Sequence, residues 1–290
     1  QGIEGFYSTI NLLNHYNIPY VGAGHNLNEA AKPYILDKGG FKIGIYACAE
    51  HEFTIATEDK PGANPFEPLD SLDHISYLKA KSDYTIILYH GGKEHYRYPS
   101  PYLRKVCKRM VEKGADLVIA QHSHCIGCYE EYNGATIVYG QGNFIFDMSD
   151  SECWQTSLIV RVGLENKGAY VDYIPIIKKG NYVGLAEGEK AHQIIDTFYK
   201  RSSDILIKGF VEEQYKEFAK KSLDNYLRYF LGFGKLISRI DRYLLKGLLV
   251  KIKYNKKKIL ALQNYIDCEA HRELLITGLK GETGDEGRPR

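Results

Sequence analysis

Apolar and polar residues alternate along the first two thirds of the chain in short runs that are typical of an α/β protein. Three apolar runs rich in β-branched residues predict buried strands at residues 84–89, 116–120 and 136–139. Apolar residues at helical spacing predict helices at residues 8–16, 70–81 and 99–113. Strand, crossover helix and strand form a βαβ unit, so we expect parallel pairing with a right-handed crossover.

The remaining pattern completes an α/β fold with a helical C-terminal extension. A hairpin is predicted at 34–47, because two glycines occupy its turn and alternation follows. Residues 51–68 are rich in proline, glycine and acids and predict a loop. Residues 156–162 and 169–177 predict an antiparallel pair of strands. From about Glu187 the chain becomes helical and basic.

The C-terminal part carries an amphipathic, basic stretch. Residues 235–258 contain nine basic residues and one acid, Asp241, beside an apolar stripe that Gly247 interrupts. Such a helix can lie on an anionic membrane or bind a partner, or it can pack on its own domain with solvated charges. The sequence leaves both readings open. Glycine at every third position near the end spans too few triplets for a collagen-like assembly, so 278–290 is predicted to be a disordered tail.

Composition narrows the class of protein. With 290 residues, 44% hydrophobic residues and a net charge of +2, the chain suits a soluble globular protein of one or two domains. No apolar run has the roughly 18 residues that span a bilayer. The near-neutral charge gives no case for a nucleic-acid partner. Of the six cysteines only Cys125 and Cys128 are close, and we expect reduced loop thiols rather than a zinc or redox motif.

Candidate chemistry gathers where the predicted parallel strands end. His90 follows the first strand, His122 and His124 follow the second, and Asn143 follows the third. In open α/β sheets, ligands bind outside these carboxyl ends. Neutral imidazole is the commonest metal ligand, and residues i and i+2 of an extended segment project to the same side. We therefore expect His122 and His124 to converge with His90 on a dinuclear metal site.

Two metals roughly 3.5–4 Å apart can clamp a phosphoryl group and activate a bridging water. Glu94 and Asp147 are the nearest candidates for added charge or for hydrogen bonds to the ligands. Carboxylate ligands are few, and chain preceding Gln1 is a possible source of more. Without a metal, the histidines would be ordinary loop residues, Asn143 a turn residue and Glu94 a surface charge.

Taken together, three segments resemble the capsule synthesis protein CapA family, which is tied to poly-γ-glutamate synthesis. They are residues 1–30, HGGKE at 90–94, and GADLVIAQHSH at 114–124 followed by YGQGNFIFD at 139–147. The resemblance covers about residues 1–177. The sequence departs from the family pattern at Gln121 and Ser123, where the family has a histidine and a proline. The family's early Gly-Asp, Asn-x-Glu and Asn-x-His segments are absent, so the resemblance implies a fragment that carries about half of the site.

The resemblance implies a layered α/β sandwich similar to calcineurin-like metallophosphoesterases. It implies that His90, His122 and His124 hold divalent metal ions, Mn, Zn or Fe. Asn143 and Glu94 are then expected to be catalytic. We also expect substrate contacts from Gln121 and Asp147.

These expectations define domains and a function. The predicted domains are 1–180, similar to the family and truncated at its N-terminus, a basic helical region at 181–277, and the tail at 278–290. The predicted function is a metal-dependent hydrolase of capsule or poly-γ-glutamate biosynthesis, acting on an envelope polymer or a phosphoester. The alternative is a non-catalytic scaffold that docks on polymer synthase subunits or an anionic membrane through 235–258. The resemblance favours the cell envelope, and the cytoplasm is the alternative.

Overall fold

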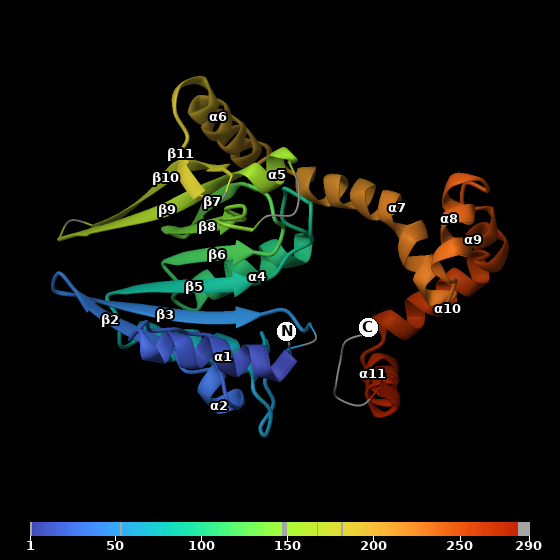
Figure 1. The fold of residues 1–290 in the computed structure, drawn as a ribbon, viewed down its shortest axis with the longest axis horizontal. Helices are drawn as coiled ribbons and strands as arrows, with labels where there is room; N and C mark the ends of the chain where they lie inside the picture. Colours follow the sequence, from blue (N-terminus) through green and yellow to red (C-terminus); the bar gives the residue numbers. More distant parts are fainter. Residues whose placement is uncertain (1, 53, 147–149, 167, 181, 284–290) are drawn as a thin grey trace. The chain divides into compact units, whose positions relative to one another are not determined.

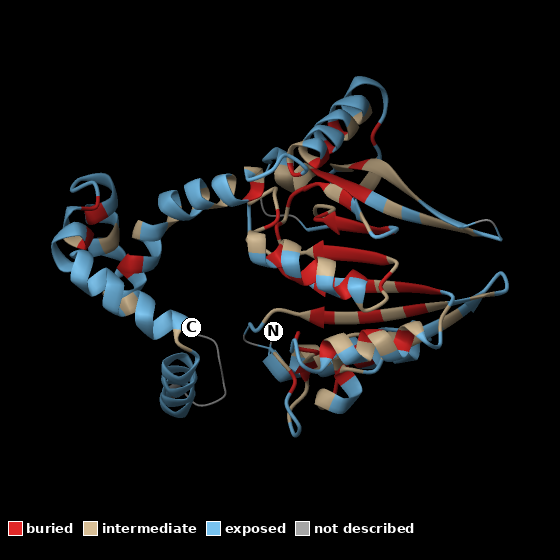
Figure 2. Cartoon of the chain, turned by 180° about the vertical axis from the view of Figure 1, so that it is seen from behind, coloured by how far each residue is buried: buried red, intermediate tan, exposed pale blue. Residues whose placement is uncertain are grey.

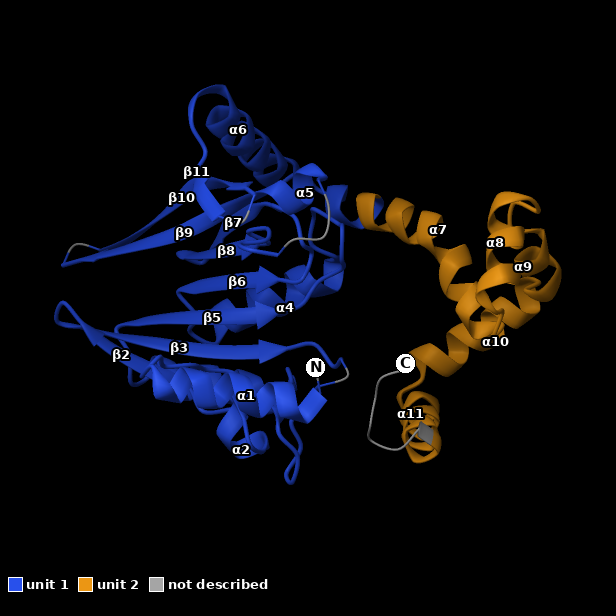
Figure 3. Ribbon diagram, in the orientation of Figure 1, with its two compact units in different colours: residues 1–213 blue, residues 214–290 orange. Residues whose placement is uncertain are grey.

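The computed structural model describes residues 2–52, 54–146, 150–166, 168–180 and 182–283. The chain divides into two compact units, residues 1–213 and 214–290 (Figure 3). Buried residues concentrate in the strands of the first unit, whereas the helices of the second are mostly exposed (Figure 2). The boundary between units falls at residue 213, and the domain boundaries inferred from composition, at 180 and 277, stay predictions.

A six-stranded mixed sheet forms the centre of the first unit (Figure 1). Its order is β2 (Tyr34–Lys38), β3 (Phe41–Ala49), β5 (Tyr84–His90), β6 (Leu117–Gln121), β8 (Ala135–Tyr139) and β7 (Tyr129–Tyr132). The four inner strands run parallel, and β2 and β7 pair antiparallel at the edges. The predicted hairpin and the predicted parallel strands are confirmed.

Helices cover one face of this sheet. They are α3 (Ser71–Lys79) and α4 (Pro101–Glu112), whose apolar faces join the strands in the main core cluster. Ser100 caps α4 by accepting a hydrogen bond from the Leu103 backbone amide, and Pro101 occupies the first turn, where its missing N–H costs nothing. Ile87 and Val118 of the central strands are fully buried beneath these helices.

A second, three-stranded antiparallel sheet faces the other side. Its order is β11 (Tyr182–Leu185), β10 (Gly168–Lys179) and β9 (Thr156–Glu165). Val160 and Val162 of β9 pack against the cluster that contains Leu117 of the central sheet. The outer helix α6 (Gly188–Asp204) buries Phe198 in a cluster with Leu158. The predicted antiparallel pair is therefore confirmed, and the two sheets lie between two helical layers.

Short elements complete the first unit. They are α1 (Gly2–His15), β1 (Ala23–Gly24), α2 (Leu27–Ala30), β4 (Gly62–Ala63) and α5 (Glu152–Gln155). Within the loop predicted at 51–68, β4 pairs antiparallel with β1. Cys125 and Cys128 are free and buried, as are Cys48 and Cys107, while Cys153 and Cys268 are partly exposed.

The second unit is helical. It contains most of α7 (Phe210–Phe230), and α8 (Lys235–Tyr243), α9 (Leu248–Lys253), α10 (Lys256–Asp267) and α11 (Glu269–Thr283). Gly247 has a φ of +82° and separates α8 from α9, which explains the interrupted stripe. Helix α11 extends to Thr283, so the predicted disordered tail is wrong for residues 278–283. The glycines at 278 and 281 continue the helix. Residues 284–290 lie outside the described part.

The predicted α/β class is confirmed in its coarse form. The molecule is a mixed α/β protein with a central mixed six-stranded sheet and a helical C-terminal region. The finer likeness to metallophosphoesterases stays a prediction. None of the described helices has both the length and the apolar character needed to cross a membrane.

Candidate functional site

The register of the parallel strands brings His90 and His122 together. His90 ends β5 and pairs with Gln121 at the end of β6, so the next residue, His122, emerges beside it. His122 Nδ1 lies 2.9 Å from His90 Nε2, and the ring centroids are 4.7 Å apart. One nitrogen donates and the other accepts, so at least one of these imidazoles is neutral. Their role as metal ligands stays a prediction.

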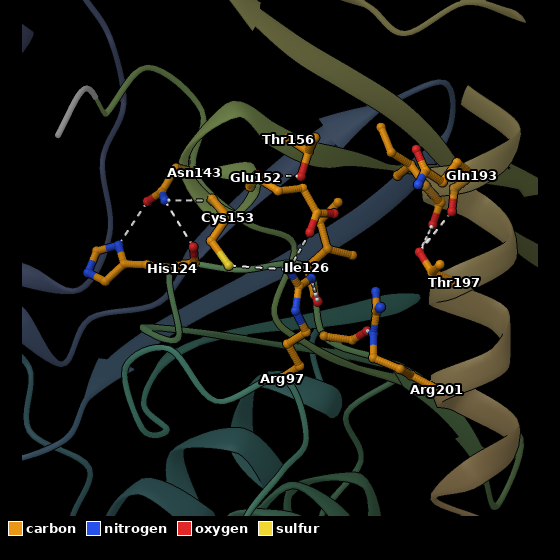
Figure 4. A network of polar contacts seen from close by, with 12 residues as sticks. Arg97, His124, Ile126, Asn143, Glu152, Cys153, Thr156, Gln193, Thr197 and Arg201 are labelled. Atoms are coloured by element: carbon orange, nitrogen blue, oxygen red, sulfur yellow. Dashed lines mark hydrogen bonds and ion pairs between the residues drawn. The ribbon is translucent and has the colours of Figure 1, made fainter. Parts of the chain in front are cut away.

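His124 is held by a different partner. Its ring centroid lies 6.0 Å from that of His122, and its Nδ1 lies 2.8 Å from Asn143 Oδ1 (Figure 4). Asn143 Nδ2 donates to the backbone carbonyls of His124 and Cys153, at 3.1 and 3.3 Å. Carbonyls only accept, so these bonds fix the amide orientation and oblige His124 Nδ1 to donate to Oδ1. Neutral His124 therefore carries its free lone pair on Nε2.

The backbone of this loop differs from the extended segment expected from the sequence. His122 has a φ of 149° and His124 a φ of 55°, values that non-glycine residues seldom adopt. The extended i, i+2 argument is therefore wrong, and the loop turns between the two rings. Gly140 permits the turn, since a Cβ there would lie 2.7 Å from Ser123 Oγ and 2.9 Å from the Cys125 carbonyl oxygen.

An aromatic wall supports His124. Trp154 of α5 stacks on its ring at 5.0 Å, and Phe146 stacks on Trp154 at 5.5 Å. Arg97 anchors α5 by donating from Nη2 to Glu152 Oε2 at 2.8 Å and from Nη1 to the Ile126 carbonyl at 3.2 Å (Figure 4). Sequence reasoning missed this wall, although the chain's single tryptophan was a signal.

The carboxylates near the imidazoles also differ from those expected. Glu52 Oε1 lies 3.5 Å from His122 Nε2, and Glu50 Oε2 accepts from the Gly92 backbone amide at 3.2 Å. Both follow the end of β3, where Ala49 pairs with His90. Glu94 is instead exposed and forms an ion pair with Lys93 at 3.9 Å. Asp147 lies outside the described residues.

Burial and charge favour the neutral form of His90. Desolvation lowers the pKa of His90, and the neighbouring His122 lowers it further. Desolvation also raises the pKa of Glu50, against the opposing hydrogen bond from Gly92. Because only neutral imidazole binds a metal, the environment of His90 suits a ligand role.

The donor set of the described residues is smaller than a metal centre needs. In the described part of the chain, no group of three or more His, Cys, Asp or Glu side chains is arranged to hold an ion. Two nitrogens bound to one tetrahedral zinc ion lie roughly 3.3 Å apart, given Zn–N bonds of about 2.0–2.1 Å. The 2.9 Å between His122 Nδ1 and His90 Nε2 approaches that spacing. The remaining positions would fall to water, substrate or donors beyond the described residues.

The strand-end histidines line a cavity of about 320 Å³. It is lined by the three histidines, Gln121, Asn143 and the apolar segment Phe144, Ile145 and Phe146. Gln121 shares this cavity with the imidazoles, and its contact with substrate stays a prediction.

Comparisons with known proteins support the resemblance. Residues 1–148 match the family model described as bacterial capsule synthesis protein PGA_cap. A capsule biosynthesis protein CapA of Bacillus anthracis is 28% identical over 187 residues, 62% of this chain and 46% of that protein. A PGA biosynthesis protein CapA of Bacillus subtilis (strain 168) is 29% identical over 161 residues, 54% of this chain and 42% of that protein. The chain thus spans less than half the length of these relatives.

A hypothetical protein from Thermus thermophilus is similar in structure, with a TM-score of 0.31 and 11% identity over 49% of this chain and 61% of that chain. The family model covers more than half of the chain and includes the three segments that carry the resemblance. The chain therefore belongs to the bacterial capsule synthesis protein PGA_cap family.

Proposed function

We propose that this protein acts in capsule or poly-γ-glutamate biosynthesis at the cell envelope, and that its strand-end site is a metal-assisted hydrolytic centre. The observation that carries the proposal is the approach of His122 Nδ1 to His90 Nε2 at 2.9 Å. An envelope polymer or a phosphoester is the expected substrate class. Family membership and the neutral state favoured for His90 support this reading.

In this proposal His90 and His122 would hold a divalent ion, Mn, Zn or Fe, and the proton now shared in their hydrogen bond would move to the other nitrogen of its ring. His122 would then carry its proton on Nε2, which lies 3.5 Å from Glu52 Oε1, and the nearby carboxylate would favour this orientation of the ring. The ion would supply Lewis-acid activation of water and of the scissile group. His124, whose expected role as a third ligand stays a prediction, has Nδ1 committed to Asn143 and offers Nε2 to a metal ion or to a proton.

Metal content tests the proposal. We expect the purified chain, equilibrated with Mn²⁺ or Zn²⁺ and then dialysed, to retain metal by elemental analysis. His122→Ala should lower the affinity at least tenfold, whereas His192→Ala on the exposed surface of α6 should not change it. Equal metal retention by the wild type and by His122→Ala would contradict the proposal.

A second candidate function is docking on an anionic membrane, and unit 2 favours it. The nine basic residues of 235–258 are all exposed, whereas the single acid of the stretch, Asp241, is fully buried. Arg228 neutralises Asp241 through a 2.8 Å bond from Nε to Oδ2. Every solvent-facing charge of the stretch is therefore positive, which complements anionic lipid headgroups.

Exposed apolar side chains adjoin these charges. Leu236, Tyr243 and Leu244 are each more than 70% exposed, and they lie on α8 or at its end, beside Arg239 and Arg242. A helix with an apolar face and a basic face lies in the membrane interface, with its long cations reaching the headgroups. This geometry supports lipid rather than polymer synthase subunits as the partner.

Sedimentation with vesicles tests the docking. We expect binding to vesicles of phosphatidylcholine with phosphatidylglycerol that weakens as salt rises. Lys251→Glu with Lys253→Glu should weaken it about tenfold or more, since each basic residue contributes about 1 kcal/mol near the surface. The matched pair Lys220→Glu with Lys221→Glu on α7 should have a smaller effect. Absence of binding at every salt concentration, together with capture by synthase subunits, would favour the protein partner.

A further inference from the structure

The described lining of the strand-end cavity carries no charged side chain other than its imidazoles. Besides the three histidines, it consists of amide side chains, a serine, glycines and the apolar residues 144–146. Glu52 approaches from outside the lining, with Oε1 3.5 Å from His122 Nε2. Lys93 also lies outside it and pairs with Glu94 at 3.9 Å. A chain of γ-linked glutamates carries one carboxylate per residue, so it would meet no lysine or arginine along the described wall.

Three consecutive large apolar side chains line the same cavity and face solvent. Phe144 is 58% exposed, Ile145 71% and Phe146 50%. Single exposed apolar residues are ordinary on a protein surface, whereas a contiguous exposed set within a cavity wall is typical of a binding surface. The cavity therefore joins a polar end, at the imidazoles, to an apolar end at residues 144–146.

Stacked rings hold the apolar end in place beside His124. Phe146 lies 5.5 Å from Trp154 at an interplanar angle of 26°, and 5.6 Å from His124 at 38°. Trp154 in turn stacks on His124 at 5.0 Å. Ring contacts of this kind restrict side-chain rotation, so less entropy is lost when a ligand covers the surface. A ligand that reaches His124 thus meets a preorganised apolar surface.

We propose that the substrate of the strand-end site is a phosphate ester of an apolar chain, with its phosphate at the histidines and its chain along residues 144–146. This assignment rests on the proposed hydrolytic function of the same site and narrows its substrate class to the phosphoester. Because the imidazoles and the apolar residues line one cavity, a single ligand can contact both. Inorganic phosphate would leave the apolar surface uncovered, and a polyglutamate chain would place charges against it, which desolvation disfavours.

Hydrolysis of such an ester consumes one molecule of water. The water oxygen would form a bond to phosphorus as the bond from phosphorus to the ester oxygen breaks, and one proton of the water would pass to the leaving oxygen. The products would be an apolar alcohol and inorganic phosphate. The reaction thus needs no co-reactant other than water.

Alkylphosphonates, whose P–C bond resists hydrolysis, test the assignment by binding rather than by activity. We expect the full chain, equilibrated with Zn²⁺, to bind octylphosphonate about tenfold or more tighter than butylphosphonate, because each buried methylene contributes about fourfold in affinity. The fluorescence of Trp154, the single tryptophan of the chain, reports the binding. Octyl glucoside, which has the chain without the phosphate, and an oligomer of γ-linked glutamate should both bind more weakly than octylphosphonate.

Ile145 separates the apolar contact from the rest of the site, because its side chain is exposed and its replacement should leave the melting temperature unchanged. Ile145→Ala should lower the preference for octyl- over butylphosphonate several-fold. Ile145→Lys should in addition strengthen binding of the γ-glutamate oligomer. Leu206→Ala and Leu206→Lys are the matched controls and should keep the wild-type preference, since Leu206 is 64% exposed and does not line the cavity.

Three results would overturn the assignment. They are equal affinities for the two phosphonates, binding of octyl glucoside as tight as that of octylphosphonate, and a preference of the wild type for the γ-glutamate oligomer. If metal is retained in any of these cases, the proposed hydrolytic function still stands. Absence of metal retention would instead overturn that function, and this substrate with it.

Discussion

At the scale of single residues, Asn143 determines which nitrogen of His124 is available for chemistry. Its amide is held by two backbone carbonyls, so its oxygen can only face His124 Nδ1. Trp154 stacks on the same ring from the other element and limits its rotation. Asn143, which the sequence predicts to be catalytic, thus fixes the tautomer of the neutral His124 ring.

Asn143→Ala tests this control of the tautomer. In the wild type we expect ¹⁵N chemical shifts that report, for the neutral ring of His124, a proton on Nδ1 and a free Nε2. Removal of the amide should release the ring, so that the signals move toward a mixture of both tautomers. Identical shifts in the two proteins would show that Asn143 does not set the proton position.

The residues of the site were only partly predictable from the sequence. His90, His122 and Asn143 follow apolar strands, and that local signal sufficed to place them at one sheet edge. Glu50 and Glu52 come close to them only because β3 pairs in register with β5, a long-range pairing that no local pattern shows. Trp154 reaches His124 from the short helix α5, and no local pattern shows that long-range contact.

At the scale of elements, a buried carboxylate fastens α4 to the central sheet. Glu130 of β7 accepts two hydrogen bonds from Arg104, at 2.8 and 2.7 Å, and one from the Tyr139 hydroxyl at 2.7 Å. Lys108 adds an ion pair at 3.2 Å. Removing one partner of a buried ion pair leaves the other charges uncompensated, which costs about 3–5 kcal/mol.

Glu130→Ala should therefore lower the free energy of unfolding of the first unit by about 3 kcal/mol. Chemical denaturation followed by circular dichroism measures the change. Glu112→Ala removes an exposed carboxylate of α4, and we expect a much smaller loss from it, because solvent screens an exposed ion pair. Equal losses in the two variants would show that the buried network does not secure α4.

The lowered pKa of Glu130 makes the stability of the first unit depend on pH. Burial alone would raise the pKa of Glu130, but hydrogen bonds from Arg104 and Tyr139 and the charges of Arg104 and Lys108 outweigh it and lower the pKa. A carboxyl with a lowered folded-state pKa stabilises the protein above its unfolded pKa, and this contribution is lost as pH falls through the folded value. Glu130→Gln should flatten the stability profile of the first unit below about pH 4.5.

Elements with strong periodicity were predicted well, and those that depend on distant partners were not. The apolar runs of β5, β6 and β8 and the helical spacing of α4 are local signals. The pair β1 and β4 has two residues in each strand, too few to leave a pattern. The loop after β6 departs from the extended geometry expected for it, because Gly140 allows a backbone approach that the loop's own residues do not encode.

At the scale of the whole molecule, the two units have separate stabilising centres. In the second unit, Arg228 and Asp241 form a buried ion pair, and the Leu249 backbone amide also donates to Asp241, at 2.9 Å. The first unit has its own apolar clusters, which include Val211 at the start of α7. The helical character and basic charge of the C-terminal region were predictable from composition, but the buried state of its one acid was not.

We expect calorimetry to resolve two unfolding transitions in the whole chain. Arg228→Ala should lower the melting temperature of one transition and leave the other unchanged, because it strands the buried Asp241 charge within the second unit alone. Val211→Ala should affect the other transition, at a cost of about 1–3 kcal/mol for a small cavity. A single transition that both variants shift equally would show that the units unfold together.

The six free thiols allow the opening of the fold to be followed by chemical modification. Cys48, Cys107 and Cys128 are buried, so an alkylating reagent cannot reach them while the sheet is closed. Desolvation also raises the pKa of each thiol, which disfavours the reactive thiolate. Cys268, between α10 and α11, and Cys153 of α5 are accessible sooner. Alkylation of Cys153 and Cys268 would therefore need no opening of the sheet, whereas the appearance of alkylated Cys48, Cys107 and Cys128 by mass spectrometry would report that the sheet has opened.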